Sequence, residues 1–210
     1  MGKRKNLQQS SLATREKKTG LVRIGSGKWK RTPLPVMDLE GLRPTGSRIR
    51  ETVFDWLRFL LGDFSGKKAL DMFAGSGALG LEFASRGGSA VLIEKDRRNA
   101  AALSEVVRRL HALSEVSVIC GDSLSACQRW PDGNFNVIFI DPPFSSGLHE
   151  PALQAARRLL TSGGLVYYET PAELEEPLPS GWRALRQGVS GAVSYRILSR
   201  APEREEGESK

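Results

Sequence analysis

The tetrapeptide Asp141-Pro142-Pro143-Phe144 combines three kinds of group that could bind a planar amine. The Asp141 carboxylate and nearby carbonyls accept hydrogen bonds, the prolines fix φ near about −65° and remove competing N–H donors, and the Phe144 ring offers a stacking face. The tetrapeptide follows an apolar run, residues 135–140, that predicts a buried strand. We therefore predict that Asp141, Pro142, Pro143 and Phe144 form a catalytic site for an exocyclic amine on an aromatic ring, with a strand-ending proline turn as the alternative.

A glycine-rich segment, residues 75–80, matches the pattern G-x-G-x-x-G between an expected strand and an expected helix. Such a turn suits a nucleotide cofactor because glycines permit positive φ and close backbone approach. Glu94 ends the next expected strand, about 20 residues after the glycines, where an acidic residue can bind ribose hydroxyls. The motif alone leaves a nicotinamide dinucleotide and a purely structural turn open.

Two further carboxylates favour S-adenosylmethionine. Asp71 stands at the tip of the strand before the glycines, where it could pair with a methionyl ammonium and would repel a pyrophosphate. Asp122 follows the third expected strand and could accept a hydrogen bond from the adenine amino group, although it or Ser123 could also cap a helix. The predicted cofactor-binding residues are Asp71, Phe73, Gly75, Gly77, Glu94, Lys95, Asp122 and Ser123.

The cysteines and the hydropathy exclude several classes of protein. Cys120 and Cys127 form no paired motif with histidines, so we expect no metal site and two reduced, structural thiols. The sequence has no run of 18 apolar residues, and its first twenty residues lack the apolar segment of a secretory signal. These features predict a cytoplasmic protein without a membrane span.

Charge is distributed unevenly along the chain. The first 31 residues contain ten basic residues and one acidic residue, so they carry +9, while the remaining residues carry −2 of the total charge of +7. A basic arm on a nearly neutral body is typical of proteins that bind a polyanion. A solvated tail that aids solubility is the alternative.

From residue 67 the chain alternates between expected strands and helices. The strands are residues 69–73, 90–94, 116–120, 135–140 and 165–169, and the helices are residues 77–86, 97–110, 123–130 and 150–160. Strands spaced by helices indicate right-handed crossovers and a parallel sheet. Two last strands, residues 182–185 and 193–198, have no helix between them and predict an antiparallel hairpin at the sheet edge. The pattern predicts an α/β, Rossmann-like fold with a mostly parallel seven-stranded sheet.

The segments outside this core have a different character. Residues 1–20 are polar, charged and without periodicity, so we expect a disordered basic arm. In residues 21–62 we expect a small basic hairpin, whose strands 22–24 and 28–31 flank Gly25-Ser26-Gly27, and a helix over 47–61 capped by Ser47. Residues 63–200 form the expected catalytic domain, and residues 201–210 form an acidic tail.

The motif Asp71-Met72-Phe73-Ala74-Gly75-Ser76-Gly77-Ala78-Leu79-Gly80, together with residues 141–144, resembles the bacterial small-subunit (16S) ribosomal RNA guanine-N2 methyltransferases. The segments 41–45 and 48–57 carry the resemblance further, and it spans about residues 21–198. The chain differs from the family pattern at Gly46-Ser47 and at Thr32-Pro33, both in the RNA-facing part. The resemblance implies a class I methyltransferase fold, S-adenosylmethionine as cofactor, and a guanine amino group of 16S-type RNA as the methyl acceptor.

The resemblance and the basic residues together imply ribosomal RNA as the partner, either free or within an assembling small subunit, and we expect a monomer. His149 lies near the tetrapeptide and is a further candidate for a base contact. A DNA adenine-N6 methyltransferase and a non-catalytic RNA-binding assembly protein remain as alternatives. The predicted RNA-binding residues are Arg23, Lys28, Lys30, Arg31, Arg43, Arg48 and Arg50.

Overall fold

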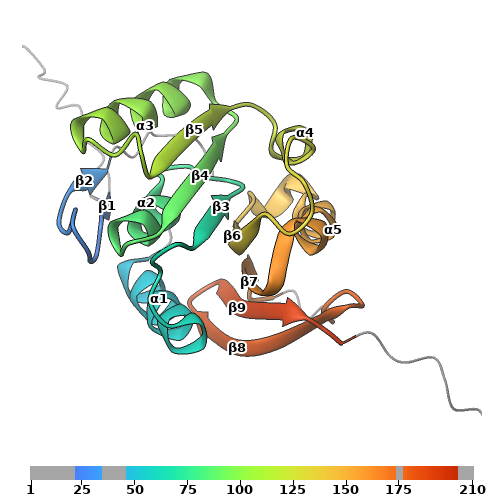
Figure 1. The fold of residues 1–210 in the computed structure, drawn as a ribbon. Coiled ribbons are helices and arrows are strands. Elements are labelled where there is room, and N and C mark those ends of the chain that lie inside the picture. Colours follow the sequence, from blue (N-terminus) through green and yellow to red (C-terminus); the bar gives the residue numbers. More distant parts are fainter. Residues whose placement is uncertain (1–21, 35–45, 174–176, 203–210) are drawn as a thin grey trace, which may run out of the picture.

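The computed structural model describes residues 22–34, 46–173 and 177–202. Its centre is a seven-stranded sheet with the strand order β5-β4-β3-β6-β7-β9-β8 (Figure 1). The strands are β3 (Lys68–Asp71), β4 (Ser89–Glu94), β5 (Val116–Cys120), β6 (Phe135–Ile140), β7 (Leu160–Pro171), β8 (Trp182–Ser190) and β9 (Val193–Arg200). β3 to β7 run parallel, and β9 pairs antiparallel with both β7 and β8. The predicted Rossmann-like sheet with its C-terminal hairpin is confirmed.

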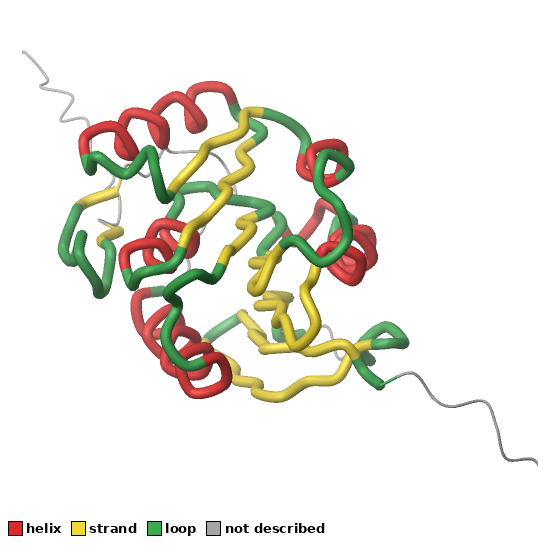
Figure 2. Tube along the Cα trace, in the orientation of Figure 1, coloured by secondary structure: helices red, strands yellow, loops and turns green. Residues whose placement is uncertain are grey.

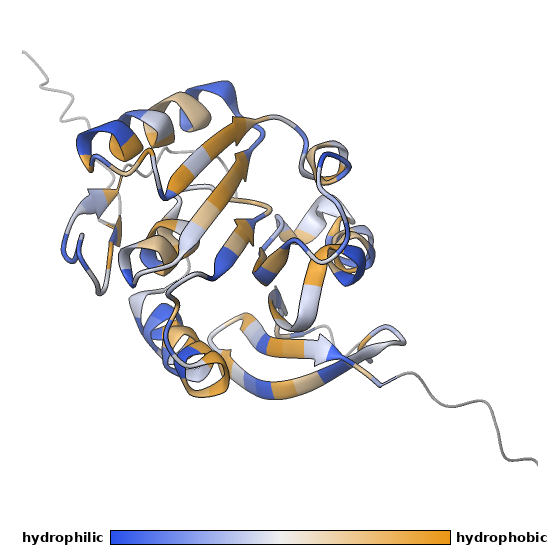
Figure 3. Cartoon of the chain, in the orientation of Figure 1, coloured by the Kyte–Doolittle hydropathy of each residue, from blue (hydrophilic) through white to orange (hydrophobic). Residues whose placement is uncertain are grey.

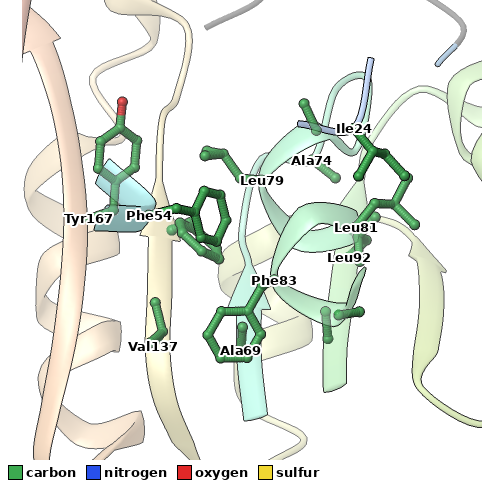
Figure 4. Close-up of a cluster of buried hydrophobic side chains, with 14 of the residues drawn as sticks. Ile24, Phe54, Ala69, Ala74, Leu79, Leu81, Phe83, Leu92, Val137 and Tyr167 are labelled. Atoms are coloured by element: carbon green, nitrogen blue, oxygen red, sulfur yellow. The ribbon is translucent and has the colours of Figure 1, made fainter. Parts of the chain in front are cut away.

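Helices cover both faces of the sheet (Figure 2). One face packs against α1 (Ser47–Leu61), α2 (Ala78–Ser85) and α3 (Arg97–Arg109), and the other packs against α4 (Ser123–Cys127) and α5 (His149–Leu159). Hydrophobic residues are concentrated along the strands, whereas the helices carry both hydrophobic and hydrophilic residues (Figure 3). The aromatic rings of Phe54, Phe83 and Tyr167 lie in the hydrophobic core between the sheet and α1, α2 and α3 (Figure 4). No helix in the described part of the chain is long and apolar enough to cross a membrane.

The strand order places a topological switch point between β3 and β6. The chain adds β4 and β5 on one side of β3, and then returns to add β6 and β7 on its other side. Parallel strands have their carboxyl ends at one edge of the sheet, and ligands of such sheets bind where the strand order reverses. The loops after β3 and β6 therefore flank the place where a ligand site is expected.

The N-terminal hairpin differs from its prediction. β1 (Val22–Arg23) pairs with β2 (Pro33–Leu34), so the expected second strand at residues 28–31 is wrong. Those residues turn instead, because Lys28 N donates to Ser85 O at 2.8 Å and Trp29 N donates to Ser85 Oγ at 2.9 Å. α1 has the predicted bounds, but Ser47 does not cap it; Gly46 holds the cap position without a side-chain hydrogen bond.

Candidate functional site

The turn between β3 and α2 depends on two glycines in the left-handed region. Gly75 has φ 51° and Gly77 has φ 74°, a conformation that other residues adopt at a cost. A Cβ atom on Gly77 would also lie 2.6 Å from the Leu103 side chain. The backbone therefore closes tightly over α3, and Gly77 leads directly into α2.

Asp71 ends β3 beneath this turn and is only 3% exposed. Its Oδ2 accepts a hydrogen bond from Gly80 N at 3.0 Å, in the first turn of α2. Burial raises the pKa of Asp71 to about 7, and the charge of Glu94 adds to the effect, while the backbone donors Gly80 and Phe73 oppose it. Such a carboxyl group gains a large stabilisation when a cation approaches it.

Glu94 links the ends of two neighbouring strands. Its Oε2 accepts a hydrogen bond from Gly75 N at 2.9 Å, and its Oε1 accepts one from Asp96 N at 2.7 Å. These bonds fix the carboxylate against the glycine turn, although burial still raises the pKa of Glu94. Each carboxylate oxygen can accept more than one hydrogen bond, so the group retains capacity for a hydroxyl donor.

Asp122 follows β5 and caps α4. Its Oδ1 accepts a hydrogen bond from Ser125 N at 2.9 Å, and the bonds from Ser125 lower the pKa of Asp122, with a smaller contribution from the charge of Lys95. Lys95 itself is exposed, and Ser123 is buried. Phe73 packs against the core on the α4–α5 face. Asp122 therefore caps α4, and this cap places an ionised carboxylate just after the carboxyl end of β5.

The tetrapeptide after β6 presents its aromatic ring to solvent. Pro142 is buried, whereas Phe144 is 43% exposed and begins the short helix η1 (Phe144–Ser146). The Phe144 ring lies 6.5 Å from the His149 ring, which in turn meets Tyr168 edge-on. Met72 N donates to Phe139 O at 3.1 Å and so ties the chain after β3 to β6. The glycine turn and the tetrapeptide therefore lie on the two sides of the switch point.

The predicted RNA-binding residues fall into three groups. Arg23, Lys28, Lys30, Arg31 and Arg48 are exposed, and Arg43 lies outside the described residues. Arg50 is only 4% exposed. Its Nη2 donates to the carbonyl of Arg23 at 2.8 Å, and its Nε lies 3.6 Å from Glu82 Oε2. This burial contradicts a direct phosphate contact for Arg50, which is instead a structural link between α1, the hairpin and α2.

Among the exposed cations, Lys28 has protein partners. Its ammonium pairs with the Glu115 carboxylate and lies 4.4 Å from the centre of the Trp29 ring. Arg23 Nη1 donates to the carbonyl of Arg31 at 3.0 Å, which places both arginines at the same end of the hairpin. Lys30 and the two arginines thus form a compact basic turn.

The sequence patterns did not point to the buried polar residues Glu82, Tyr167 and Glu169. Glu82 and Glu169 are 1% and 4% exposed, and the Tyr167 hydroxyl donates to Glu169. The available signal was a carboxylate flanked by apolar residues, Leu81 and Phe83 for Glu82 and the run 165–168 for Glu169. Charged residues are rarely buried unless they are paired, so each of these positions predicts a specific partner.

Comparison with known proteins agrees with this arrangement. The ribosomal RNA small subunit methyltransferase D of Haemophilus influenzae is 38% identical over 185 residues, which cover 85% of this chain and 93% of that protein. The protein of the same name from Escherichia coli is 38% identical over 188 residues, covering 87% and 91%. The solved structure of a putative methyltransferase from Escherichia coli superposes with a TM-score of 0.75 at 36% identity, covering 86% of this chain and 98% of that one.

The family model of Conserved hypothetical protein 95 matches residues 22–199, which is most of the described chain. Its match includes the hairpin, α1, the glycine turn and the tetrapeptide. The resemblance inferred from the motifs is thereby confirmed. The chain belongs to the Conserved hypothetical protein 95 family, a family of methyltransferases.

Proposed function

We propose that this protein, acting as a monomer, transfers a methyl group from S-adenosylmethionine to the exocyclic N2 amine of a guanine in 16S ribosomal RNA. The observation that carries the proposal is the position of residues 141–144 after β6, across the switch point from the glycine turn after β3. The names of the similar proteins support ribosomal RNA as the substrate class. The choice of guanine N2 rests on the amine-binding tetrapeptide and on the motif resemblance.

The charged groups of the site fit S-adenosylmethionine. Asp71, buried and with its pKa raised to about 7, suits the methionyl ammonium. Glu94, fixed against Gly75, suits the ribose hydroxyls, and ionised Asp122 suits the adenine amino group. When bound, the cofactor supplies an electrophilic methyl group on a sulfonium. A pyrophosphate would meet three carboxylates, which disfavours a dinucleotide.

The tetrapeptide would position the acceptor amine. Asp141 and a carbonyl near Pro142 would accept hydrogen bonds from the two N2–H groups. These bonds would direct the nitrogen lone pair toward the methyl carbon. The exposed face of Phe144 would stack on the base, a contact worth about 1–3 kcal/mol. A paired guanine must first leave its helix to reach such a site. Orientation of this kind lowers the activation free energy by at most about 7–11 kcal/mol.

The modified nucleotide can be located by mapping methylated bases in ribosomal RNA from a strain that lacks this protein. We expect one guanine-N2 methyl group to be missing from 16S RNA and to return when the purified protein and S-adenosylmethionine are added. If every guanine-N2 methyl group persists, the proposal is wrong. Loss of adenine-N6 methylation in DNA would favour the DNA enzyme, and failure to bind labelled S-adenosylmethionine would favour a non-catalytic assembly protein.

Cofactor affinity should depend on pH through Asp71. Its carboxyl group is protonated below a pKa of about 7 and then cannot pair with an ammonium. We expect the affinity for S-adenosylmethionine, measured by calorimetry, to rise severalfold between about pH 6 and pH 7.5. Asp71→Asn should bind weakly and lose this rise, whereas Asp63→Asn on the surface should retain it. A slope that survives in Asp71→Asn would assign the effect to another group.

The basic turn should contribute to RNA affinity in a salt-dependent way. Lys30 is exposed at its tip, so Lys30→Ala should weaken binding of 16S RNA fragments at low salt. Each lost phosphate contact reduces the slope of log K against log salt by about 0.7–0.9. Arg129→Ala, an exposed cation after α4, serves as the control and should leave the slope unchanged. Equal slopes for Lys30→Ala and the wild type would exclude this turn from the RNA interface.

A further inference from the structure

A buried carboxylate lies next to the tetrapeptide at the carboxyl end of β7. Ile140, the last residue of β6, pairs in register with Tyr168. One residue further along, the same register brings Asp141 beside Glu169, because neighbouring strands lie about 4.8 Å apart. Glu169 is 4% exposed, and in the described residues no ion pair joins it to a cation. A buried charge without a counter-ion is costly, so it calls for a function.

Tyr167 donates a hydrogen bond to this carboxylate from the hydrophobic core. Its ring packs in the core with its hydroxyl pointing out of the cluster (Figure 4), and the hydroxyl donates to Glu169 Oε2. Burial raises the pKa of Tyr167 well above its ordinary value, and the charges of Glu169 and Asp141 raise it further. The phenol therefore stays protonated as a donor, and it lies in the field of both carboxylates.

The charge on Glu169 is set by two opposing effects. Burial raises the pKa of Glu169, and the hydrogen bond from Tyr167 lowers it. The surrounding elements add few titratable groups: β9 contributes Tyr195, the register partner of Glu169, and the loop after β6 contributes Asp141. α1 contributes the Trp56 ring, which stacks on Tyr195 at 5.5 Å and does not ionise. Tyr167 is thus the donor that favours the ionised form.

Building on the proposed function, we propose that Glu169 is a second carboxylate that supports methyl transfer beside Asp141, and that Tyr167 keeps Glu169 ionised. In the transfer, the N2 lone pair forms the new N–C bond. The C–S bond breaks with its electron pair remaining on sulfur, and the positive charge passes to nitrogen. One N2 proton then leaves to Asp141. Glu169 and Tyr167 are positioning residues, since they act on the amine through the field at Asp141.

The physical basis is electrostatic stabilisation of a charge that moves. Positive charge arrives at the amine only as the new bond forms, so a fixed negative charge nearby lowers the barrier without binding the neutral base more tightly. Glu169 is already desolvated and oriented before the reaction. Its contribution should therefore appear in kcat, with little change in KM.

The test is the pH dependence of kcat on the RNA substrate, for wild type, Glu169→Gln and Tyr167→Phe. The wild type should lose activity at acid pH as Glu169 becomes protonated. Glu169→Gln should keep only the acid limb of Asp141, moved to lower pH because the neighbouring negative charge is gone, and its kcat should be about tenfold or more below the wild-type plateau. Tyr167→Phe should recover the plateau, but only at higher pH, because Glu169 has lost its donor. A purely structural role would lower kcat without moving the limb.

Controls keep the outcomes distinct. Each variant must retain its melting temperature within a few degrees and its affinity for S-adenosylmethionine, and Glu105→Gln on α3 serves as the matched surface substitution. An acid limb that stays at its wild-type position in Glu169→Gln, or that coincides in Tyr167→Phe and wild type, overturns the inference. Carbon-13 NMR titration of Glu169 in the protein alone provides a readout without methyl transfer. A Glu169 carboxyl that stays protonated through neutral pH, or a titration that does not change in Tyr167→Phe, also overturns it, whether or not the proposed reaction occurs.

Discussion

Replacing Asp141 with alanine should reduce methyl transfer to ribosomal RNA by about a thousandfold or more, a loss of about 4 kcal/mol in transition-state stabilisation. The side chain follows β6 at the switch point and is the proposed acceptor for the N2–H group. Without it the amine loses its orientation and its proton acceptor. The affinity for S-adenosylmethionine should stay within a few fold, because the cofactor residues lie at or just after the carboxyl ends of β3, β4 and β5. Single-turnover transfer of a labelled methyl group measures the first effect, and calorimetry measures the second.

A matched pair of variants separates geometry from charge at this position. Asp141→Asn keeps a carbonyl acceptor and loses the charge, so it should retain more activity than Asp141→Ala and less than the wild type. Asp63→Asn, in the exposed turn after α1, should transfer at the wild-type rate. Near wild-type transfer by Asp141→Ala would falsify the proposed role of the tetrapeptide.

Replacing Glu82 with alanine should strongly destabilise the N-terminal half of the described chain. Glu82 Oε2 accepts from Gly25 N at 3.1 Å, and its Oε1 accepts from Arg86 Nη2 at 2.5 Å. The alanine removes the buried carboxylate beside Arg50 and Arg86, and breaking a buried ion pair typically costs about 3–5 kcal/mol. For a domain of this size the melting temperature should fall by about 6–20 °C.

Thermal and denaturant unfolding test this expectation. Glu82→Gln keeps an oxygen for Gly25 N and should lose less stability than Glu82→Ala. The control is Glu105→Ala, which breaks an exposed pair with Arg108 on α3 and should change the free energy of unfolding by less than about 1 kcal/mol. If both alanine variants lose similar stability, the contacts of Glu82 with Gly25, Arg50 and Arg86 do not hold the hairpin in place.

Much of the sheet could be predicted because its signal is local. Residues 116–120 and 135–140 form strands with the expected bounds, and every residue of β6 except Asn136 is buried. The apolar face of 47–61 likewise predicted α1 with the observed ends. The ends of these strands then located Asp71, Glu94, Asp122 and Asp141, because parallel strands place such residues at one edge.

The remaining features depend on contacts between distant segments. The basic residues 28–31 have no local reason to avoid a strand; they turn because Ser85, more than fifty residues away, binds Lys28 and Trp29. Arg50 resembles any exposed helix cation until Glu82 lies against it. Glu169 sits in an apolar strand, and only the position of Tyr167 on the same face supplies its partner. Sequence patterns contain no record of these pairings.

The short helix α2 has a consequence for the shape of the RNA that can bind. All eight of its residues are buried, its first turn closes the glycine turn, and its last turn anchors the basic hairpin through Glu82 and Ser85. At about 1.5 Å per residue, its length is about 12 Å. The helix therefore fixes the distance between the proposed methyl-transfer site and the proposed phosphate contacts. An RNA that binds as proposed would have to present its target base and its backbone at that fixed spacing, so the proposed interface would select a folded RNA geometry as well as a base.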